Sequence, residues 1–160
     1  GKFAKSLNKR VLFMASGGLS HHPTKYYPLL GEGTPEVQAW QMEGSDGGSF
    51  TKDEWFQQLL DLHIEGGQML YAGTRTKKDI RLNPEIDQKF LDVIVTGDLS
   101  PLDGWEIEGL FESAGVGFTE LHTWVAAISA NMSCGGNPPV IDFYIDTLEY
   151  AIGYGIIHAN

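Results

Sequence analysis

The apolar run Val11-Leu12-Phe13-Met14-Ala15 is followed directly by Ser16-Gly17-Gly18-Leu19-Ser20-His21. A short apolar run that ends at two glycines predicts a buried strand feeding a tight turn. Glycine has no Cβ, so the backbone can turn sharply there and bring the next polar side chains to the end of the strand. In open α/β sheets, ligands bind at that edge. The sequence therefore predicts a ligand site immediately after the two glycines.

Ser20 and His21 are the polar side chains that this turn presents. Histidine is the side chain best suited to move protons near neutral pH, which makes His21 a candidate acid or base. The alternative is that the glycines form only a turn and that His21 is an ordinary surface residue. The local pattern does not decide between these two interpretations.

Capping signals predict two helices in the middle of the chain. Thr51-Lys52-Asp53-Glu54 has the pattern of a capping box, and the helix that it starts is expected to end at Gly66-Gly67. Asn83 can cap a second helix with Pro84 at its first position, where the missing N–H costs nothing. This second helix is expected to end by Gly97.

Further helices and a strand are predicted in the C-terminal half. Asp103 with Glu106 suggests one helix start, and Thr119 could cap another helix. A half-buried strand is predicted where apolar residues alternate with polar or aromatic ones, with Ile141, Phe143 and Ile145 inward and Asp142, Tyr144 and Asp146 outward. The order strand, helices, strand predicts an α/β fold in which a mixed sheet is flanked by helices, and the chain 1–160 forms a single or partial domain.

Composition narrows the possible partners. The net charge is −10, which argues against nucleic acid or an anionic membrane as a partner. There is no apolar run of about 18 residues, so no membrane span is expected, and no secretion signal is recognised. Cys134 is the only cysteine, which excludes an internal disulfide and fits a reducing cytoplasm.

The region Pro23–Gly48 predicts a long irregular loop. Its aromatic residues would suit a ring-binding pocket, namely Tyr26, Tyr27 and Trp40.

Four motifs in order along the chain resemble the class III extradiol catechol dioxygenases. They are Ser16–His21, Leu82-Asn83-Pro84-Glu85, the stretch Gly115–Ala127 that contains Glu120 and Trp124, and the ending Gly153-Tyr154-Gly155-Ile156-Ile157. The resemblance runs from about Lys9 to Ile157, and the spacing of the first two motifs looks most like the 2,3-dihydroxyphenylpropionate dioxygenases. It implies a ring-cleaving oxidoreductase that acts on a catechol-type aromatic compound with dioxygen.

The resemblance also implies a cofactor and two site residues. The family holds non-haem Fe(II) with two histidines and one carboxylate, leaving open positions on the metal. Glu120 matches the family's glutamate ligand, and His21 matches the acid/base histidine beside the metal. The alternative for Glu120 is an acidic residue in the first turn of a helix, where it stabilises the helix dipole.

The family's two histidine ligands lie in its N-terminal half, and this chain resembles the C-terminal part. Activity is therefore expected to need an N-terminal half or a partner chain, and an oligomer is expected. The remaining histidines are not expected to be ligands. His22 is expected to be structural and His63 to be a core or interface residue, and neither His122 nor His158 is expected to bind the metal. A non-catalytic binding or scaffold subunit of the same fold is the alternative function. A zinc hydrolase is disfavoured, because there is no His-Glu-x-x-His or paired-cysteine spacing.

Overall fold

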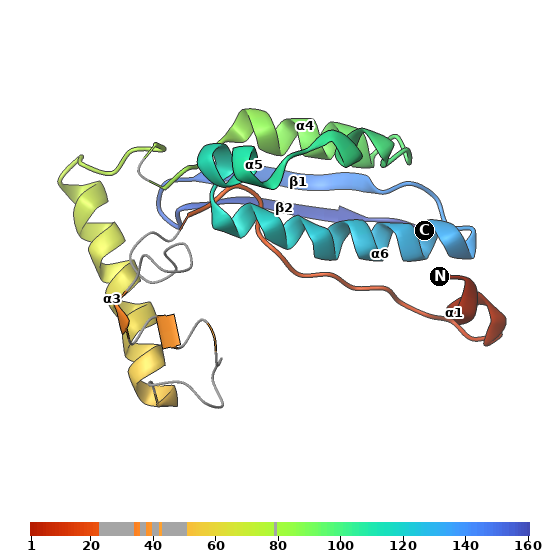
Figure 1. Ribbon diagram of the computed structural model, residues 1–160, viewed down its shortest axis with the longest axis horizontal. Helices are drawn as coiled ribbons and strands as arrows, with labels where there is room; N and C mark the ends of the chain where they lie inside the picture. Colours follow the sequence, from red (N-terminus) through yellow and green to blue (C-terminus); the bar gives the residue numbers. More distant parts are fainter. Residues whose placement is uncertain (23–33, 36–37, 40–41, 43–50, 79) are drawn as a thin grey trace.

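The computed structural model describes residues 1–22, 34–35, 38–39, 42, 51–78 and 80–160. The aromatic residues of the predicted loop, Tyr26, Tyr27 and Trp40, lie outside these described residues. The elements in Figure 1 are α1 (Lys2–Ser6), α3 (Lys52–Tyr71), α4 (Pro84–Ile94), the 3₁₀ helix η1 (Ser100–Gly104), α5 (Ile107–Ala114), the 3₁₀ helix η2 (Val116–Glu120), α6 (Leu121–Cys134), β1 (Val140–Thr147) and β2 (Ile152–His158). Within the described ranges, no helix is both long and apolar enough to cross a membrane.

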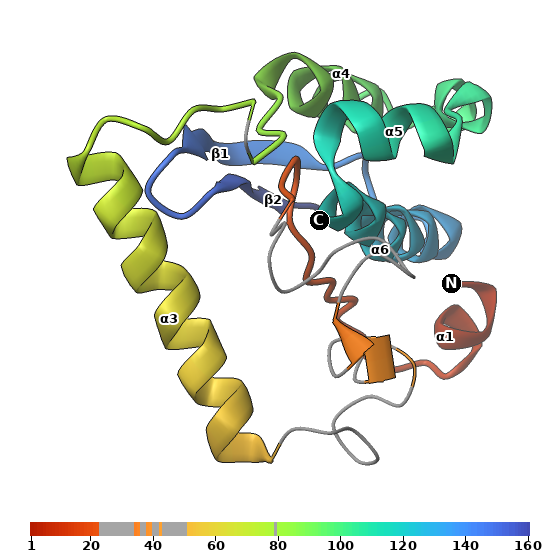
Figure 2. The same cartoon turned by 60° about the vertical axis from the view of Figure 1, so that its left-hand side comes forward.

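The strands β1 and β2 form an antiparallel pair, and α4, α5 and α6 lie on one side of it (Figures 1 and 2). Phe90 of α4 is at the centre of the core between these layers and is 1% exposed. Its ring makes edge-on contacts with Trp105, Phe118 and Trp124 at centroid distances of 6.1–6.4 Å, an arrangement favoured by the ring quadrupoles. The predicted α/β class is therefore confirmed, with helices packed on one face of the sheet.

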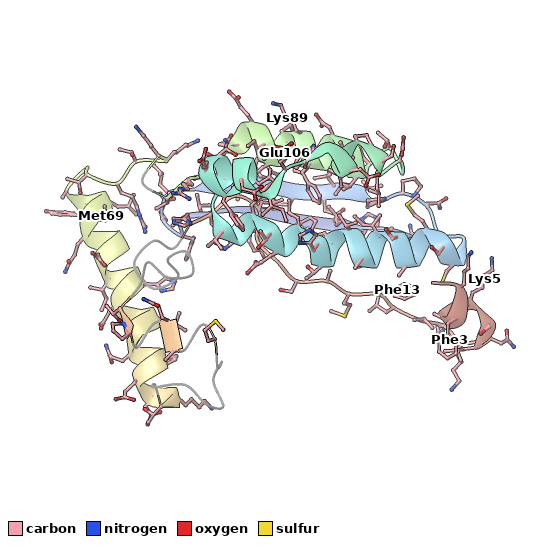
Figure 3. The ribbon with its side chains drawn as sticks, viewed as in Figure 1. Phe3, Lys5, Phe13, Met69, Lys89 and Glu106 are labelled. Atoms are coloured by element: carbon pink, nitrogen blue, oxygen red, sulfur yellow. The ribbon has the colours of Figure 1, made fainter. Side chains whose placement is uncertain are left out.

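The predicted strand over Val11–Ala15 is wrong. These residues have no regular secondary structure, and Leu12 and Met14 are 80% and 83% exposed. The segment runs alongside the helical layer towards α1, and Phe3 and Phe13 lie away from the centre of the core (Figure 3). An apolar run becomes a buried strand only when a neighbouring strand pairs with it. In the part of the chain that the structure describes, β1 pairs with β2 instead.

The capping signals of α3 and α4 are confirmed. The Thr51 hydroxyl accepts a hydrogen bond from Glu54 N at 3.3 Å, and the Glu54 carboxylate accepts one from Thr51 N at 2.8 Å. Helix α3 nevertheless continues through Gly66-Gly67 to Tyr71, because glycine lowers helix stability without removing a backbone donor. The Asn83 side chain accepts from Ile86 N at 3.3 Å and begins α4, which ends at Ile94, before Gly97.

The predicted start of α6 is wrong. Thr119 lies within η2, and its hydroxyl donates to the carbonyl of Val116 at 2.8 Å instead of capping a helix. Helix α6 begins at Leu121 with Glu120 at the N-cap position. Helix α5 likewise begins without a side-chain cap, after Glu106, and Asp103 belongs to η1.

A bulge in β1 changes which side chains face the core. Ile141 pairs with Ile157, but Phe143 pairs with Ile156, so the register shifts between them. Because strand side chains alternate with a period of two, one extra residue moves all later side chains to the other face. Tyr144 therefore packs against the core, whereas Phe143 and Ile145 are exposed, which corrects the predicted alternation.

Candidate functional site

The segment that carries His21 is attached to the start of α6. The Thr123 hydroxyl donates to the carbonyl of Ser16 at 2.9 Å, and the Trp124 indole N–H donates to the carbonyl of Gly17 at 3.0 Å. Both donors lie in the first turns of the helix that follows Glu120. These contacts bring two motifs that are far apart in the sequence into one place.

The backbone of residues 19–21 is held by three further segments. Four backbone hydrogen bonds connect it to β2, to the end of α5 and to η2, and each has an ordinary length. They join Leu19 N to Gly153 O (3.1 Å), Gly153 N to Ser20 O (2.9 Å), His21 N to Ala114 O (2.9 Å) and Gly117 N to His21 O (3.1 Å).

The imidazole of His21 is oriented by its own turn. Its Nδ1 lies 2.8 Å from the carbonyl oxygen of Leu19. Because a carbonyl can only accept, Nδ1 carries the proton in the neutral ring and Nε2 keeps its lone pair. Gly18 and Gly117 lie against the ring, where any Cβ would collide with it. The two glycines thus leave space for the His21 side chain.

Glu120 lies beside the same two glycines. Its carboxylate oxygen Oε2 accepts a hydrogen bond from Gly18 N at 2.5 Å. A Cβ at Gly17 would lie 2.8 Å from the Glu120 carbonyl oxygen and 2.9 Å from its Cβ, so the close approach needs glycine there. Glu120 is exposed and His21 is half-buried. Gly18 touches both side chains, which places the two predicted site residues next to one another.

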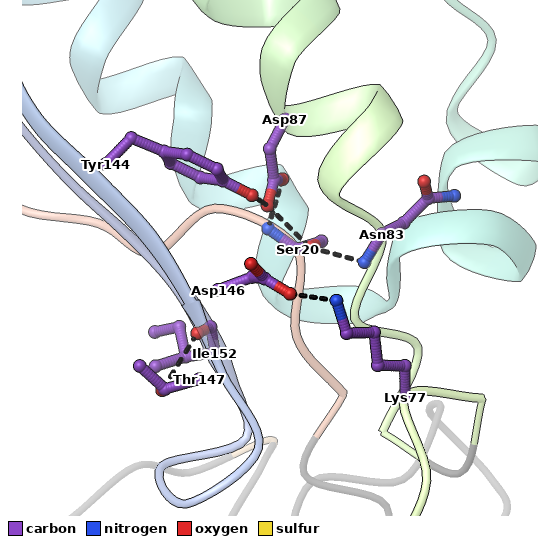
Figure 4. A network of polar contacts seen from close by, with 8 residues as sticks. All are labelled: Ser20, Lys77, Asn83, Asp87, Tyr144, Asp146, Thr147 and Ile152. Carbon is purple, nitrogen blue, oxygen red and sulfur yellow. Dashed lines mark hydrogen bonds and ion pairs between the residues drawn. The ribbon is translucent and has the colours of Figure 1, made fainter.

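Ser20 is not presented to a ligand, contrary to the prediction. It is fully buried, and its hydroxyl and backbone N–H both bind the buried carboxylate of Asp87 (Figure 4). Ser20 N donates to Oδ1 at 2.7 Å, and Ser20 Oγ donates to Oδ2 at 2.8 Å. Tyr144 of β1 donates its hydroxyl to Oδ2 at 2.9 Å, and Asn83 N donates to Ser20 Oγ at 2.8 Å.

Burial raises the pKa of Asp87, and the hydrogen bonds from Ser20 and Tyr144 oppose that rise because they stabilise the charged form. Burial and the adjacent Asp87 raise the pKa of Tyr144, so its hydroxyl stays protonated and acts as a donor. Asp87 is not among the residues predicted from the sequence. Its spacing is the signal that could have identified it: Asp87 precedes Phe90 by three residues and Leu91 by four, so all three lie on the buried face of α4.

The other histidines do not join His21 and Glu120. His22 is buried, and its Nδ1 accepts from Val116 N at 3.2 Å, which agrees with the structural role expected for it. His63 is exposed on α3, so it is not a core residue, and His122 is exposed on α6. His158 pairs with Asp142 at 2.9 Å.

Across the residues that the structure describes, no group of three or more His, Cys, Asp or Glu side chains could hold a metal ion. The exposed carboxylate of Glu120 is nevertheless a donor of the kind that suits Fe(II). The described part of the chain therefore fits a contribution of one carboxylate ligand, and not a complete set of ligands.

We expect Gly117→Ala to displace the His21 ring, because the new Cβ would occupy the position of Cε1 and Nε2. The ring would then lose its contact between Nδ1 and the Leu19 carbonyl. Nitrogen NMR of the imidazole would detect the change as altered His21 resonances. Gly109→Ala is the matched control, because a Cβ at Gly109 meets nothing within 4 Å. Unchanged His21 resonances in Gly117→Ala would contradict the placement of the ring.

Comparison with known proteins connects this geometry to a family. Residues 1–137 match the family described as the catalytic LigB subunit of aromatic ring-opening dioxygenase. A 2,3-dihydroxyphenylpropionate/2,3-dihydroxicinnamic acid 1,2-dioxygenase of Rhodococcus sp is 35% identical over 99% of this chain and 48% of its own length. Proteins of the same description from Rhodococcus jostii (strain RHA1) and Dechloromonas aromatica (strain RCB) are 34% and 32% identical, over 98% and 100% of this chain and 47% and 49% of their own lengths. The chain spans about half the length of the curated relatives that it matches. Because the family match covers most of the chain, the chain belongs to the LigB family of aromatic ring-opening dioxygenases.

Proposed function

We propose that this chain is part of a non-haem Fe(II)-dependent extradiol dioxygenase that cleaves the ring of a catechol-type aromatic compound. The observation that carries the proposal is the contact of Gly18 with both the Glu120 carboxylate and the His21 ring. The carboxylate of Glu120 is a group that can bind a metal ion, and the imidazole of His21 is a group that can carry a proton. The family to which the chain belongs supports this pairing.

Glu120 is the proposed anionic ligand. The hydrogen bond from Gly18 N holds Oε2 and so fixes the orientation of the carboxylate, as outer contacts of metal ligands commonly do. The carboxylate is exposed on this chain, which suits a ligand that meets the rest of a site from another segment. When bound, the iron would bring a catechol and dioxygen together at one centre.

His21 is the proposed acid and base. With Nδ1 donating to the Leu19 carbonyl, Nε2 is the atom that can accept a proton from a catechol hydroxyl and later return it. The glycines at 18 and 117 leave the ring its space, and the four backbone bonds of the turn restrict its movement. His21 therefore acts on the substrate without being a metal ligand.

The two histidine ligands are proposed to come from an N-terminal half or a partner chain. Relatives about twice as long support this division. Large apolar side chains on the open face of the sheet also support it, because such patches commonly mark interfaces. These exposed side chains are Phe143, Ile145, Tyr154 and Ile156. An oligomer in the cytoplasm is proposed on the same grounds, together with the free thiol of Cys134.

The substrate is proposed to be a catechol, and the first to test is one with a carboxylated side chain. The relatives are named for 2,3-dihydroxyphenylpropionate and 2,3-dihydroxicinnamic acid, which share that chemistry. Dioxygen would be the second substrate, and the product a ring-opened compound.

The proposal is tested by anaerobic calorimetry and oxygen uptake. Fe(II) titrated into this chain alone is expected to bind weakly, because no group of three or more ligating side chains lies together among the described residues. The chain joined to, or coexpressed with, a polypeptide that supplies the family's histidines is expected to bind iron tightly and consume oxygen with 2,3-dihydroxyphenylpropionate. Stoichiometric, tight binding by the chain alone would contradict the divided site. An iron-loaded complete protein that cleaves no catechol would favour a non-catalytic scaffold subunit.

A further inference from the structure

The turn that carries His21 is tied to a buried carboxylate on another element. Ser20 N, immediately before His21 in the chain, donates to Asp87 Oδ1 at 2.7 Å. The other hydrogen bonds of the turn have backbone or imidazole partners, so Asp87 is the only carboxylate that holds residues 19–21 in the described part of the chain. Hydrogen bonds to an ionised acceptor are about twice as strong as neutral ones. The hydrogen bonds from Ser20 and Tyr144 favour that ionised form of Asp87, whereas its burial opposes it.

The same carboxylate joins three elements that are distant in the sequence. Its Oδ2 accepts from the hydroxyls of Ser20 and Tyr144, and Ser20 Oγ in turn accepts from Asn83 N at the start of α4 (Figure 4). Asp87 and Ser20 are both fully buried. A Cβ at Gly153 of β2 would collide with Asp87 Oδ2, so β2 also lies against the carboxylate.

We propose that Asp87 is a positioning residue for His21. By binding both the N–H and the hydroxyl of Ser20, Asp87 fixes the backbone from which the imidazole projects. The ring then keeps Nδ1 on the Leu19 carbonyl and Nε2 available to the substrate. This inference rests on the proposed acid/base role of His21.

Asp87→Asn is the variant that tests it with least change in shape. The amide group that replaces one oxygen donates and cannot accept. If it faces Ser20 N, two donors meet; if it faces the hydroxyls of Ser20 and Tyr144, both must turn from donors to acceptors, and the negative charge of the acceptor is lost. Either arrangement weakens the hold on Ser20, so the turn is expected to shift. Because a displacement of about 1 Å at a reacting group can cost about 10²-fold in rate, kcat is expected to fall by about that factor while KM for the catechol changes little.

The complete enzyme is compared in four forms: wild type, Asp87→Asn, His21→Phe and the double variant. If Asp87 acts through His21, Asp87→Asn lowers kcat in the wild type and has almost no further effect once His21 is replaced. Asp92→Asn is the matched control, because Asp92 lies on the same helix, is exposed and accepts a hydrogen bond from the side chain of Gln88 at 2.8 Å. It is expected to leave kcat unchanged.

A second readout does not depend on turnover. Nitrogen NMR of the metal-free protein should show altered His21 imidazole resonances in Asp87→Asn and wild-type resonances in Asp92→Asn. Tyr144→Phe is the milder variant if Asp87→Asn does not fold, because it removes one donor and leaves both Ser20 contacts. It is expected to lower kcat less than Asp87→Asn, with the same lack of effect in the His21→Phe background.

The outcomes separate the two proposals. If the kcat losses of Asp87→Asn and His21→Phe multiply, and the His21 resonances do not move, then Asp87 serves only the stability of the fold and the inference is overturned. If His21→Phe alone has wild-type kcat, then the proposed role of His21 fails, whatever Asp87 does.

Discussion

Glu120→Ala is expected to remove the iron and all ring cleavage from the complete enzyme. The substitution deletes the proposed anionic ligand, and two neutral histidines hold a divalent ion poorly. It also removes the acceptor of Gly18 N, so the turn loses one contact. Iron content by metal analysis after anaerobic reconstitution, and oxygen uptake on a catechol, measure the two losses.

Two further variants separate the ligand from the hydrogen bond of Glu120. Glu120→Gln keeps an oxygen that can accept from Gly18 N but has no charge, so it should retain the turn and still lose most of the iron. Glu112→Ala removes an exposed carboxylate on α5 and should behave as the wild type. Full iron content in Glu120→Ala would show that the ligand has been assigned to the wrong residue.

His21→Phe is expected to keep the iron and to slow turnover by about 10²–10⁴-fold, the usual contribution of a general acid or base. Phenylalanine has a ring of similar shape but no nitrogen, so it can occupy the space beside Gly18 and Gly117 without carrying a proton. Turnover by oxygen uptake, normalised to bound iron, is the measurement. His122→Phe is the control, because His122 is exposed and two residues beyond Glu120.

Two results would contradict the roles proposed for Glu120 and His21. If His21→Phe loses its iron while Glu120→Ala keeps it, the ligand and the acid/base residue have been exchanged. If both variants keep iron and full activity, neither residue belongs to the site.

Local signals in the sequence predicted local structure well. Thr51 and Asn83 begin helices because their side chains bind backbone N–H groups only three residues ahead, and no distant partner is needed. Features that depend on distant partners were predicted poorly. Val11–Ala15 has the composition of a buried strand but no pairing strand among the described residues, and the bulge in β1 depends on how β2 pairs with it.

The candidate site shows the same division. The pairing of His21 with Glu120 was predicted from a resemblance, and the structure brings the two residues together at Gly18. Their roles stay predictions, because no ligand contact tests them. Asp87 was missed because a helical carboxylate is usually solvated, and only the tertiary contact with Ser20 and Tyr144 stabilises it in the interior.

The network of bonds around residues 19–21 affects the entropy of ligand binding. Fixing the backbone of one residue costs about 1–2 kcal/mol in conformational entropy. The hydrogen bonds that fix the turn come from Gly153, Ala114, Gly117 and Asp87, and none of them needs a ligand. The entropy of this turn is therefore lost when the chain folds and not when a ligand binds. A ligand that reaches His21 therefore meets an ordered loop, and its affinity is not reduced by the ordering of that loop.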